Sequence, residues 1–104
     1  MNEKLTDPWA SPPEDFRFIL FERINLAKNE VRFYYLAYLP SLLGRAVVRV
    51  YGRKGGQQRI LTTPVASLEE AWPTIRKHIR TRLNHGYRIV SPPEYCTPEK
   101  GQLT

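Results

Sequence analysis

The sequence predicts an α+β fold in which an antiparallel sheet of four to five strands carries one long helix on one face. Four segments between residues 16 and 63 have the composition and alternation of strands, and residues 67–86 have helical spacing. The turns between them are short, as antiparallel neighbours require. A chain of 104 residues holds one modest core. We therefore expect a flexible N-terminal arm over residues 1–15, one domain over 16–90 and a flexible tail over 91–104.

The arm contains three prolines and no periodic pattern, but Trp9 lies among them and is expected to pack on the domain. We expect strands over residues 16–26, 31–39, 45–53 and 57–63, and a short last strand over 87–90. In the first strand the alternation breaks at Phe21, which indicates a bulge. Residues 40–44 should connect the second and third strands, and Pro64 should end the fourth.

The expected helix begins near Ser67, which can cap it, and Glu70 lies in the capping-box position. Pro73 leaves two alternatives, a loose first turn or a helix that starts near Pro73 itself. Gly86 should end the helix. The stripe that packs on the sheet consists of Leu68, Ala71, Trp72, Ile75, Ile79 and Leu83.

The positive charge is concentrated in the part expected to fold. Residues 1–30 hold four basic and six acidic side chains, residues 31–90 hold eleven and two, and residues 91–104 carry a net charge of −1, which together give +6. A surplus of +9 on about sixty residues favours a polyanion partner. The alternative is a surface whose charge serves solubility alone.

The third strand carries the most distinctive pattern. One row of side chains, Ala46, Val48 and Val50, is apolar and expected to face the core. The other row, interrupted by Val47 and followed by Lys54 in the turn, consists of Arg45, Arg49, Tyr51 and Arg53. Guanidinium groups match phosphate oxygens, and a tyrosine ring offers a plane for a base or a sugar. This row predicts a nucleic-acid contact, against the alternative of an edge whose arginines pair with sheet neighbours.

The helix adds a second basic set on its exposed sides, Arg76, Lys77, Arg80 and Arg82, with His78 among them. Such a set attracts polyanions without specificity, although a solvated helix face has the same composition. Arg82 near the helix end is explained by the helix dipole.

The sequence offers no catalytic constellation, so we expect a protein that is not an enzyme and that needs no cofactor or metal. His78 and His85 are two helical turns apart, too far to hold one metal ion. Cys96 is the single cysteine and has no base near it in sequence. No small-molecule substrate and no membrane segment are evident, and we expect a cytoplasmic protein or one associated with the nucleoid.

In order along the chain, the segments Arg32-Phe33-Tyr34-Tyr35-Leu36, Val48-Arg49-Val50-Tyr51-Gly52-Arg53, Gly56-Gln57, Ser67-Leu68-Glu69-Glu70-Ala71 and Gly86-Tyr87 resemble a WGR domain. The resemblance runs from about Leu26 to Val90. WGR domains occur in the DNA-dependent poly(ADP-ribose) polymerases, where they bind DNA near a break, and in bacterial proteins, sometimes nearly alone. No polymerase domain is present in these 104 residues, so no such activity is expected.

The resemblance implies roles for the tripeptide that names the family, Trp-Gly-Arg, whose place Tyr51-Gly52-Arg53 takes here. Tyr51 would stack on the nucleic acid, Gly52 would allow close approach of the backbone, and Arg53 would contact DNA or a neighbouring domain. Two departures stand out: Tyr51 replaces tryptophan, and the turn at residues 54–56 is shorter than usual in the family.

Two functions remain open at this point. The first is a nucleic-acid-binding module, with DNA favoured over RNA and with ends or nicks as targets. The second is an adaptor that binds an acidic protein partner through the same row, or through its proline-rich arm and tail. A weaker third is an accessory subunit of an enzyme. Binding that follows phosphate density rather than a particular polypeptide separates the first from the second.

Overall fold

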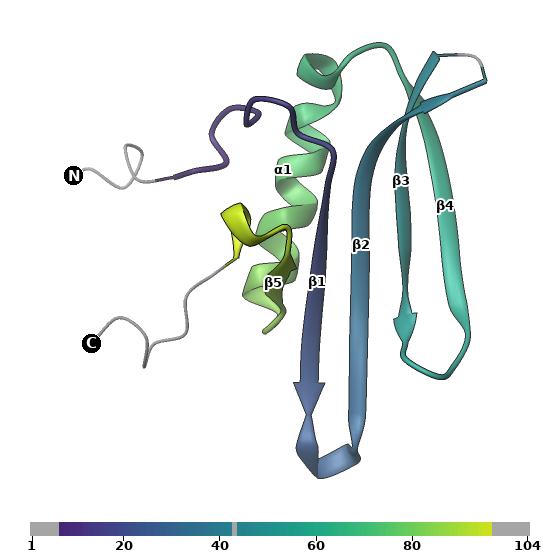
Figure 1. Ribbon diagram of the computed structural model, residues 1–104, viewed down its shortest axis with the longest axis vertical. Coiled ribbons are helices and arrows are strands. Elements are labelled where there is room, and N and C mark those ends of the chain that lie inside the picture. Colours follow the sequence, from purple (N-terminus) through teal and green to yellow (C-terminus); the bar gives the residue numbers. More distant parts are fainter. Residues whose placement is uncertain (1–6, 43, 97–104) are drawn as a thin grey trace.

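A computed structural model of the chain describes residues 7–42 and 44–96, and it has the expected α+β fold (Figure 1). The strands are β1 (Phe18–Asn25), β2 (Glu30–Ser41), β3 (Gly44–Arg53), β4 (Gln58–Val65) and β5 (Arg88–Ser91), and the helix is α1 (Leu68–Asn84). Short 3-10 helices, η2 (Leu26–Lys28) and η3 (Pro93–Tyr95), follow β1 and β5. The strands form one antiparallel sheet in the order β4-β3-β2-β1-β5.

The strand ends differ from the expected ones, most clearly at two places. The connection expected over residues 40–44 is wrong, because β2 continues to Ser41 and β3 begins at Gly44, so that Ser41 pairs with Gly44. Pro64 lies inside β4 rather than after it. Since β4 is an edge strand, a residue without an N–H group is tolerated there. The pairing of β1 with β5 shifts register between Leu20 and Phe21, where a bulge was expected, but the extra residue is Val90 of β5, and β1 pairs with β2 without interruption.

The core lies between α1 and one face of the sheet. Ile19 and Phe21 of β1 are fully buried there, as are Ile75 and Ile79 of α1. Burying a side chain of this size contributes about 1.5–3 kcal/mol. In Figure 1, α1 overlaps β1 and β5, whereas the β3–β4 hairpin lies clear of it. The hairpin thus lies toward the edge of the helix, although Val47 of β3 and Val65 of β4 still contact the core cluster.

The two faces of β3 are the reverse of the expected ones. The pairings align Phe21 with Tyr34 and Tyr34 with Tyr51, so the row that contains Tyr51 shares a face with the core. Val47 is buried in the core cluster, and Tyr51 packs against it. The apolar row, Ala46, Val48 and Val50, lies on the face away from α1. The apolar composition of Ala46, Val48 and Val50 indicated the wrong face, because the register between β2 and β3 decides which row faces the helix.

The helix begins where Ser67 caps it, and Pro73 lies within it. The Ser67 hydroxyl oxygen accepts a hydrogen bond from the Glu70 N–H at 3.1 Å, as expected of an N-cap. The Glu70 carboxylate accepts from the Ala66 N–H at 3.4 Å. A start near Pro73 is therefore wrong. Gly86, with a φ of +88°, follows the helix end as expected.

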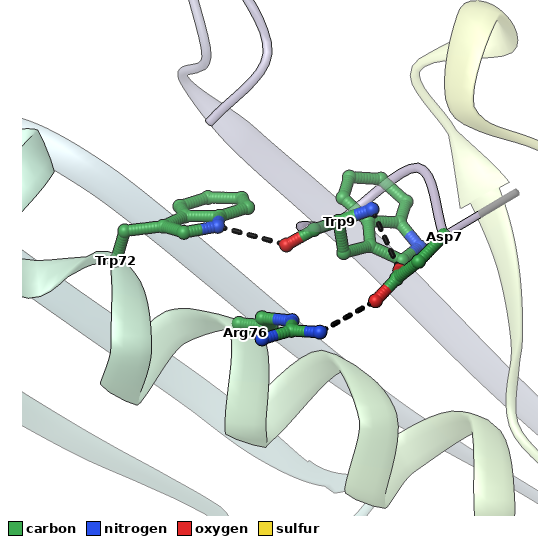
Figure 2. A network of polar contacts seen from close by, with 4 residues as sticks. All are labelled: Asp7, Trp9, Trp72 and Arg76. Atoms are coloured by element: carbon green, nitrogen blue, oxygen red, sulfur yellow. Dashed lines mark hydrogen bonds and ion pairs between the residues drawn. The ribbon is translucent and has the colours of Figure 1, made fainter. Parts of the chain in front are cut away.

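The N-terminal segment lies against α1 from Asp7 onward (Figure 2). The Trp72 indole N–H donates to the Trp9 carbonyl at 2.9 Å, and Arg76 forms an ion pair with Asp7 at 2.6 Å. Trp9 is 8% exposed and lies edge-on to Tyr95 of η3. Trp9 thus belongs to the core. The flexibility expected of the arm and the tail stays a prediction, and residues 1–6 and 97–104 lie outside the described residues.

Candidate functional site

A pair of stacked tyrosines lies where the β3–β4 hairpin leaves the cover of α1. Tyr34 of β2 and Tyr51 of β3 are direct cross-strand neighbours, with ring centroids 5.1 Å apart and planes inclined by 15°. Tyr34 is 3% exposed, whereas Tyr51 is partly exposed. Tyr34 therefore supports one face of the Tyr51 ring and holds it in place at the surface. Packing of Tyr51 on the sheet is therefore compatible with stacking of the same ring on a ligand.

Cationic side chains surround the inner tyrosine. Arg49, one row along β3, donates from Nη1 to the Tyr34 hydroxyl oxygen at 3.3 Å. The guanidinium carbon of Arg82 lies 4.7 Å from the centre of the Tyr34 ring, a cation–π contact. We refer to Tyr34, Arg49, Tyr51, His78 and Arg82 as the aromatic–basic cluster. It joins three elements, β2, β3 and α1.

His78 completes this cluster from α1. Its Nδ1 lies 3.4 Å from the Tyr34 hydroxyl oxygen. Burial lowers the pKa of the His78 imidazole below its ordinary value of 6.5, and the charges of Arg49 and Arg82 lower this pKa further, as does Lys77. The imidazole is therefore neutral at neutral pH. The same cations that disfavour its protonation would be satisfied by a bound anion.

Arg82 has an unmet hydrogen-bonding group. Its Nε is buried and has no hydrogen-bond partner among the described residues. The guanidinium carbon also lies 5.2 Å from the centre of the Tyr87 ring, so the group contacts both rings. The expected explanation of Arg82 by the helix dipole alone is thus incomplete.

Exposed arginines flank the cluster along the hairpin. Arg53 lies two residues beyond Tyr51 on the same face, and Arg59 of β4 is the direct partner of Tyr51. Both are exposed, and neither guanidinium group forms an ion pair or hydrogen bond with the described part of the chain. Arg45 lies at the far end of β3, with its guanidinium carbon 5.9 Å from the centre of the Tyr38 ring. The hairpin contains no acidic residue between positions 44 and 65.

Gly52 is required by the hairpin itself. A Cβ atom at this position would lie 2.4 Å from the Gln57 carbonyl oxygen and 3.2 Å from the Gln58 Cα. Any side chain there would force the two strands apart. The close approach that Gly52 permits is therefore to the backbone of β4, within the protein.

The other predicted site residues do not converge on this cluster. Lys54 forms an ion pair with Glu22 of β1 at 2.7 Å, toward the opposite face of the sheet. Arg76 pairs with Asp7 on the flank of α1 that faces the arm. Arg80 acts electrostatically on Asp7 and lies on that flank too. Lys77 is exposed and close enough to His78 to affect its pKa.

The sequence did not predict Tyr34 or Arg59 as site residues, and it placed His78 and Arg82 only in the basic set on the exposed sides of the helix. The pairing of Ser41 with Gly44 fixes the register that pairs residue 34 with residue 51, so the position of this turn could have indicated Tyr34. His78 and Arg82 are four residues apart and hence on one helix face. Nothing in the sequence indicates that this face meets Tyr34.

Among residues 7–42 and 44–96, no group of three or more histidine, cysteine, aspartate or glutamate side chains could hold a metal ion. Nor does any helix within these ranges have the length and apolar character needed to cross a membrane. Cys96 is exposed, and its thiol lies 3.6 Å from the Pro92 carbonyl oxygen.

Taken together, one helix on an antiparallel sheet and an aromatic–basic cluster at the edge of that helix define a small α+β module with an aromatic, positively charged surface. The family model of the WGR domain matches residues 17–93, most of the chain. The chain therefore belongs to the WGR domain family, which includes nucleic-acid-binding modules. Comparison with curated proteins gave no match, and comparison with solved structures gave none either.

Proposed function

We propose that this WGR domain is a non-enzymatic DNA-binding module that contacts duplex ends or nicks through the aromatic–basic cluster and the arginines beside it. The observation that carries the proposal is the partly exposed Tyr51 ring, backed by Tyr34 and followed by the unpaired Arg53. A supported aromatic plane beside guanidinium groups suits a terminal base or sugar with its phosphates.

Each residue has a distinct part in this proposal. Tyr51 stacks on the exposed terminus, where no neighbouring base pair covers the ring plane. Arg53 contacts the phosphates beside it, and Arg59 does so from the next strand. Arg49 orients Tyr34 and adds positive charge behind the ring. Arg45 and Lys77 extend the positive surface at longer range.

The arrangement favours nucleic acid over an acidic protein. An acidic peptide would satisfy the arginines, but it would leave the Tyr51 plane without a stacking partner. Continuous duplex would satisfy the arginines as well, yet its bases are already stacked on one another. A duplex end or nick offers both a phosphate group and a free ring face.

The test is fluorescence anisotropy with the full chain and three labelled DNAs: an intact duplex closed at both ends by hairpin loops, the same closed duplex with one nick bearing a 5′-phosphate, and an open blunt-ended duplex. We expect tighter binding to the nicked and blunt-ended DNAs. The Arg53→Ala variant should weaken binding to all three, while the matched control Arg80→Ala, which removes the same charge from the far flank of α1, should leave the preference unchanged. Polyglutamate serves as a competitor.

Equal binding to intact and interrupted duplexes would contradict recognition of ends. If polyglutamate competes as effectively as unlabelled DNA at the same concentration of negative charge, the result would instead support the acidic-protein adaptor. Absence of binding at low salt would overturn the nucleic-acid function altogether.

A further inference from the structure

The sheet face opposite α1 is apolar over three successive cross-strand rows. We call these rows the open face. They are Leu39–Ala46–Pro64, Phe18–Ala37–Val48–Thr62 and Leu20–Tyr35–Val50–Ile60. Their hydroxyl groups come from Thr62, Tyr35 and Ser91, which pairs with Leu20 at the β5 edge. A sheet with one buried face and one solvated face has polar side chains on the solvated one, so this composition requires an explanation.

No described element packs on the open face. The helix, the arm through Trp9, and Tyr95 of η3 all belong to the core cluster on the other side of the sheet. Ala37 and Ala46 are nonetheless buried, because larger neighbours on the same face close over them. Ile60 on the edge strand is 66% exposed. The result is an apolar sheet surface that is exposed to solvent.

Charge is almost absent from this surface. Glu22 and Lys54 lie at one end of it and neutralise each other in an ion pair. Arg88, the partner of Glu22 on β5, lies at the same end. An anionic ligand or an acidic protein would find no complementary group across the three apolar rows. The occupant must itself be flat, apolar and uncharged.

A second copy of this chain offers such a surface. The three rows and the adjoining row, Glu22–Phe33–Gly52–Gln58, together span eight residues at about 3.3 Å per residue and four strands at about 4.8 Å, which is roughly 500 Å² on each copy. Two copies would bury roughly 1,000 Å² in total, the area at which specific interfaces begin. An identical patch on both partners is what a two-fold symmetric dimer requires.

The positive charge of the chain does not oppose this association. The arginines of the aromatic–basic cluster lie on the α1 side, so two sheets would separate those of one copy from those of the other. Sheets packed face to face are about 10 Å apart, already beyond the screening length of about 8 Å at physiological salt. Electrostatic repulsion between the two copies is therefore weak.

We propose that two copies of this chain associate through their open faces into a two-layered sheet sandwich. The two aromatic–basic clusters then point outward on opposite sides of the dimer. The association does not depend on the proposed binding of DNA, and its test contains no nucleic acid.

The test compares two variants of the full chain by sedimentation equilibrium over a series of concentrations. Thr62 and Thr63 are adjacent and exposed on β4, but Thr62 lies on the open face and Thr63 on the α1 face. We expect the unmodified chain and Thr63→Glu to approach 24.2 kDa, twice the chain mass of 12.1 kDa. Thr62→Glu, the same chemical change on the other face, should remain at 12.1 kDa.

A monomer at every concentration for the unmodified chain would overturn the proposal. A dimer that persists equally in both threonine variants would also overturn it, since the interface would then lie elsewhere, for example at the free edge of β4. Circular dichroism checks that each variant is folded. Ile60→Lys, at an exposed position of the same face, provides a second variant and should also give the monomer.

Discussion

Tyr34 and Tyr51 form a stacked pair. The inner ring, Tyr34, is buried and its hydroxyl group accepts a hydrogen bond from Arg49, whereas the outer ring, Tyr51, lies on it and reaches the surface. The inner hydroxyl is occupied by hydrogen bonds, whereas the outer hydroxyl has none within the described part of the chain. The ring of Tyr51, rather than its hydroxyl group, is thus the feature available to a ligand.

This difference predicts the effect of two substitutions at one position. Tyr51→Phe keeps the ring and should bind interrupted duplex within about two-fold of the unmodified chain. Tyr51→Ala removes the ring and should lose about 1–3 kcal/mol of binding free energy. Anisotropy with nicked DNA measures both. Equal losses in the two variants would assign the contact to the hydroxyl group.

The flanking arginines predict the salt dependence of binding. Each guanidinium group that contacts a phosphate releases counterions, so Arg53→Ala and Arg59→Ala should each reduce the slope of log K against log salt by about 1. Arg80→Ala should leave the slope unchanged, because this side chain lies beside Asp7 on the far flank of α1. A reduced slope in Arg80→Ala would show instead that the basic set on the helix contacts DNA, as the sequence predicts.

His78 predicts opposite effects of pH on stability and on binding. Its pKa is lowered in the folded state, so between that value and 6.5 the unfolded chain binds more protons, and the free energy of unfolding should fall as pH decreases through this window. A bound phosphate favours the imidazolium form, so affinity for DNA should rise as the pH decreases through the same window. The His78→Gln variant should show neither this fall in stability nor this rise in affinity.

Urea denaturation and anisotropy between about pH 7.5 and about pH 5.5 measure the two effects. His85→Gln, an exposed histidine just past the helix end, is the matched control and should keep both trends. Retention of both trends in His78→Gln would contradict the assignment to this residue.

The backbone approach at Gly52 predicts an effect on stability. Gly52→Ala places a methyl group against the Gln57 carbonyl oxygen and should reduce the free energy of unfolding by about 1–3 kcal/mol. Gly56→Ala is the control, because a Cβ there lies no closer than 3.5 Å to its neighbours. Thermal denaturation distinguishes them. Equal stability of the two variants would contradict the close approach.

The packed arm predicts that Trp9 stabilises the domain, although it precedes the residues that match the family model. Trp9→Ala should reduce the free energy of unfolding by about 3–5 kcal/mol, as is typical for removal of a buried indole. Trp9→Phe should lose less, because a ring still contacts Tyr95. A stability unchanged in Trp9→Ala, measured in urea, would show that the arm does not pack in solution.

Local patterns were sufficient to predict the elements of this fold. The strand segments, the cap at Ser67 and the helix end at Gly86 depend on neighbouring residues, which the sequence displays directly. The faces of β3 were predicted in reverse, because both rows of this strand contain apolar residues and only the register with β2 distinguishes them. The candidate site was predicted in part for the same reason. Arg49 and Tyr51 stand out in one strand, whereas Tyr34 and Arg82 join them only through pairing and helix packing.

Both tryptophans of the chain are in one place, with Trp9 and Trp72 6.4 Å apart between the arm and α1. Neither belongs to the aromatic–basic cluster or to the open face. The intrinsic fluorescence of the protein excited at the indole band therefore reports the region where the arm packs on α1. Changes there can be followed optically while the aromatic–basic cluster and the open face are titrated, with no label introduced on either.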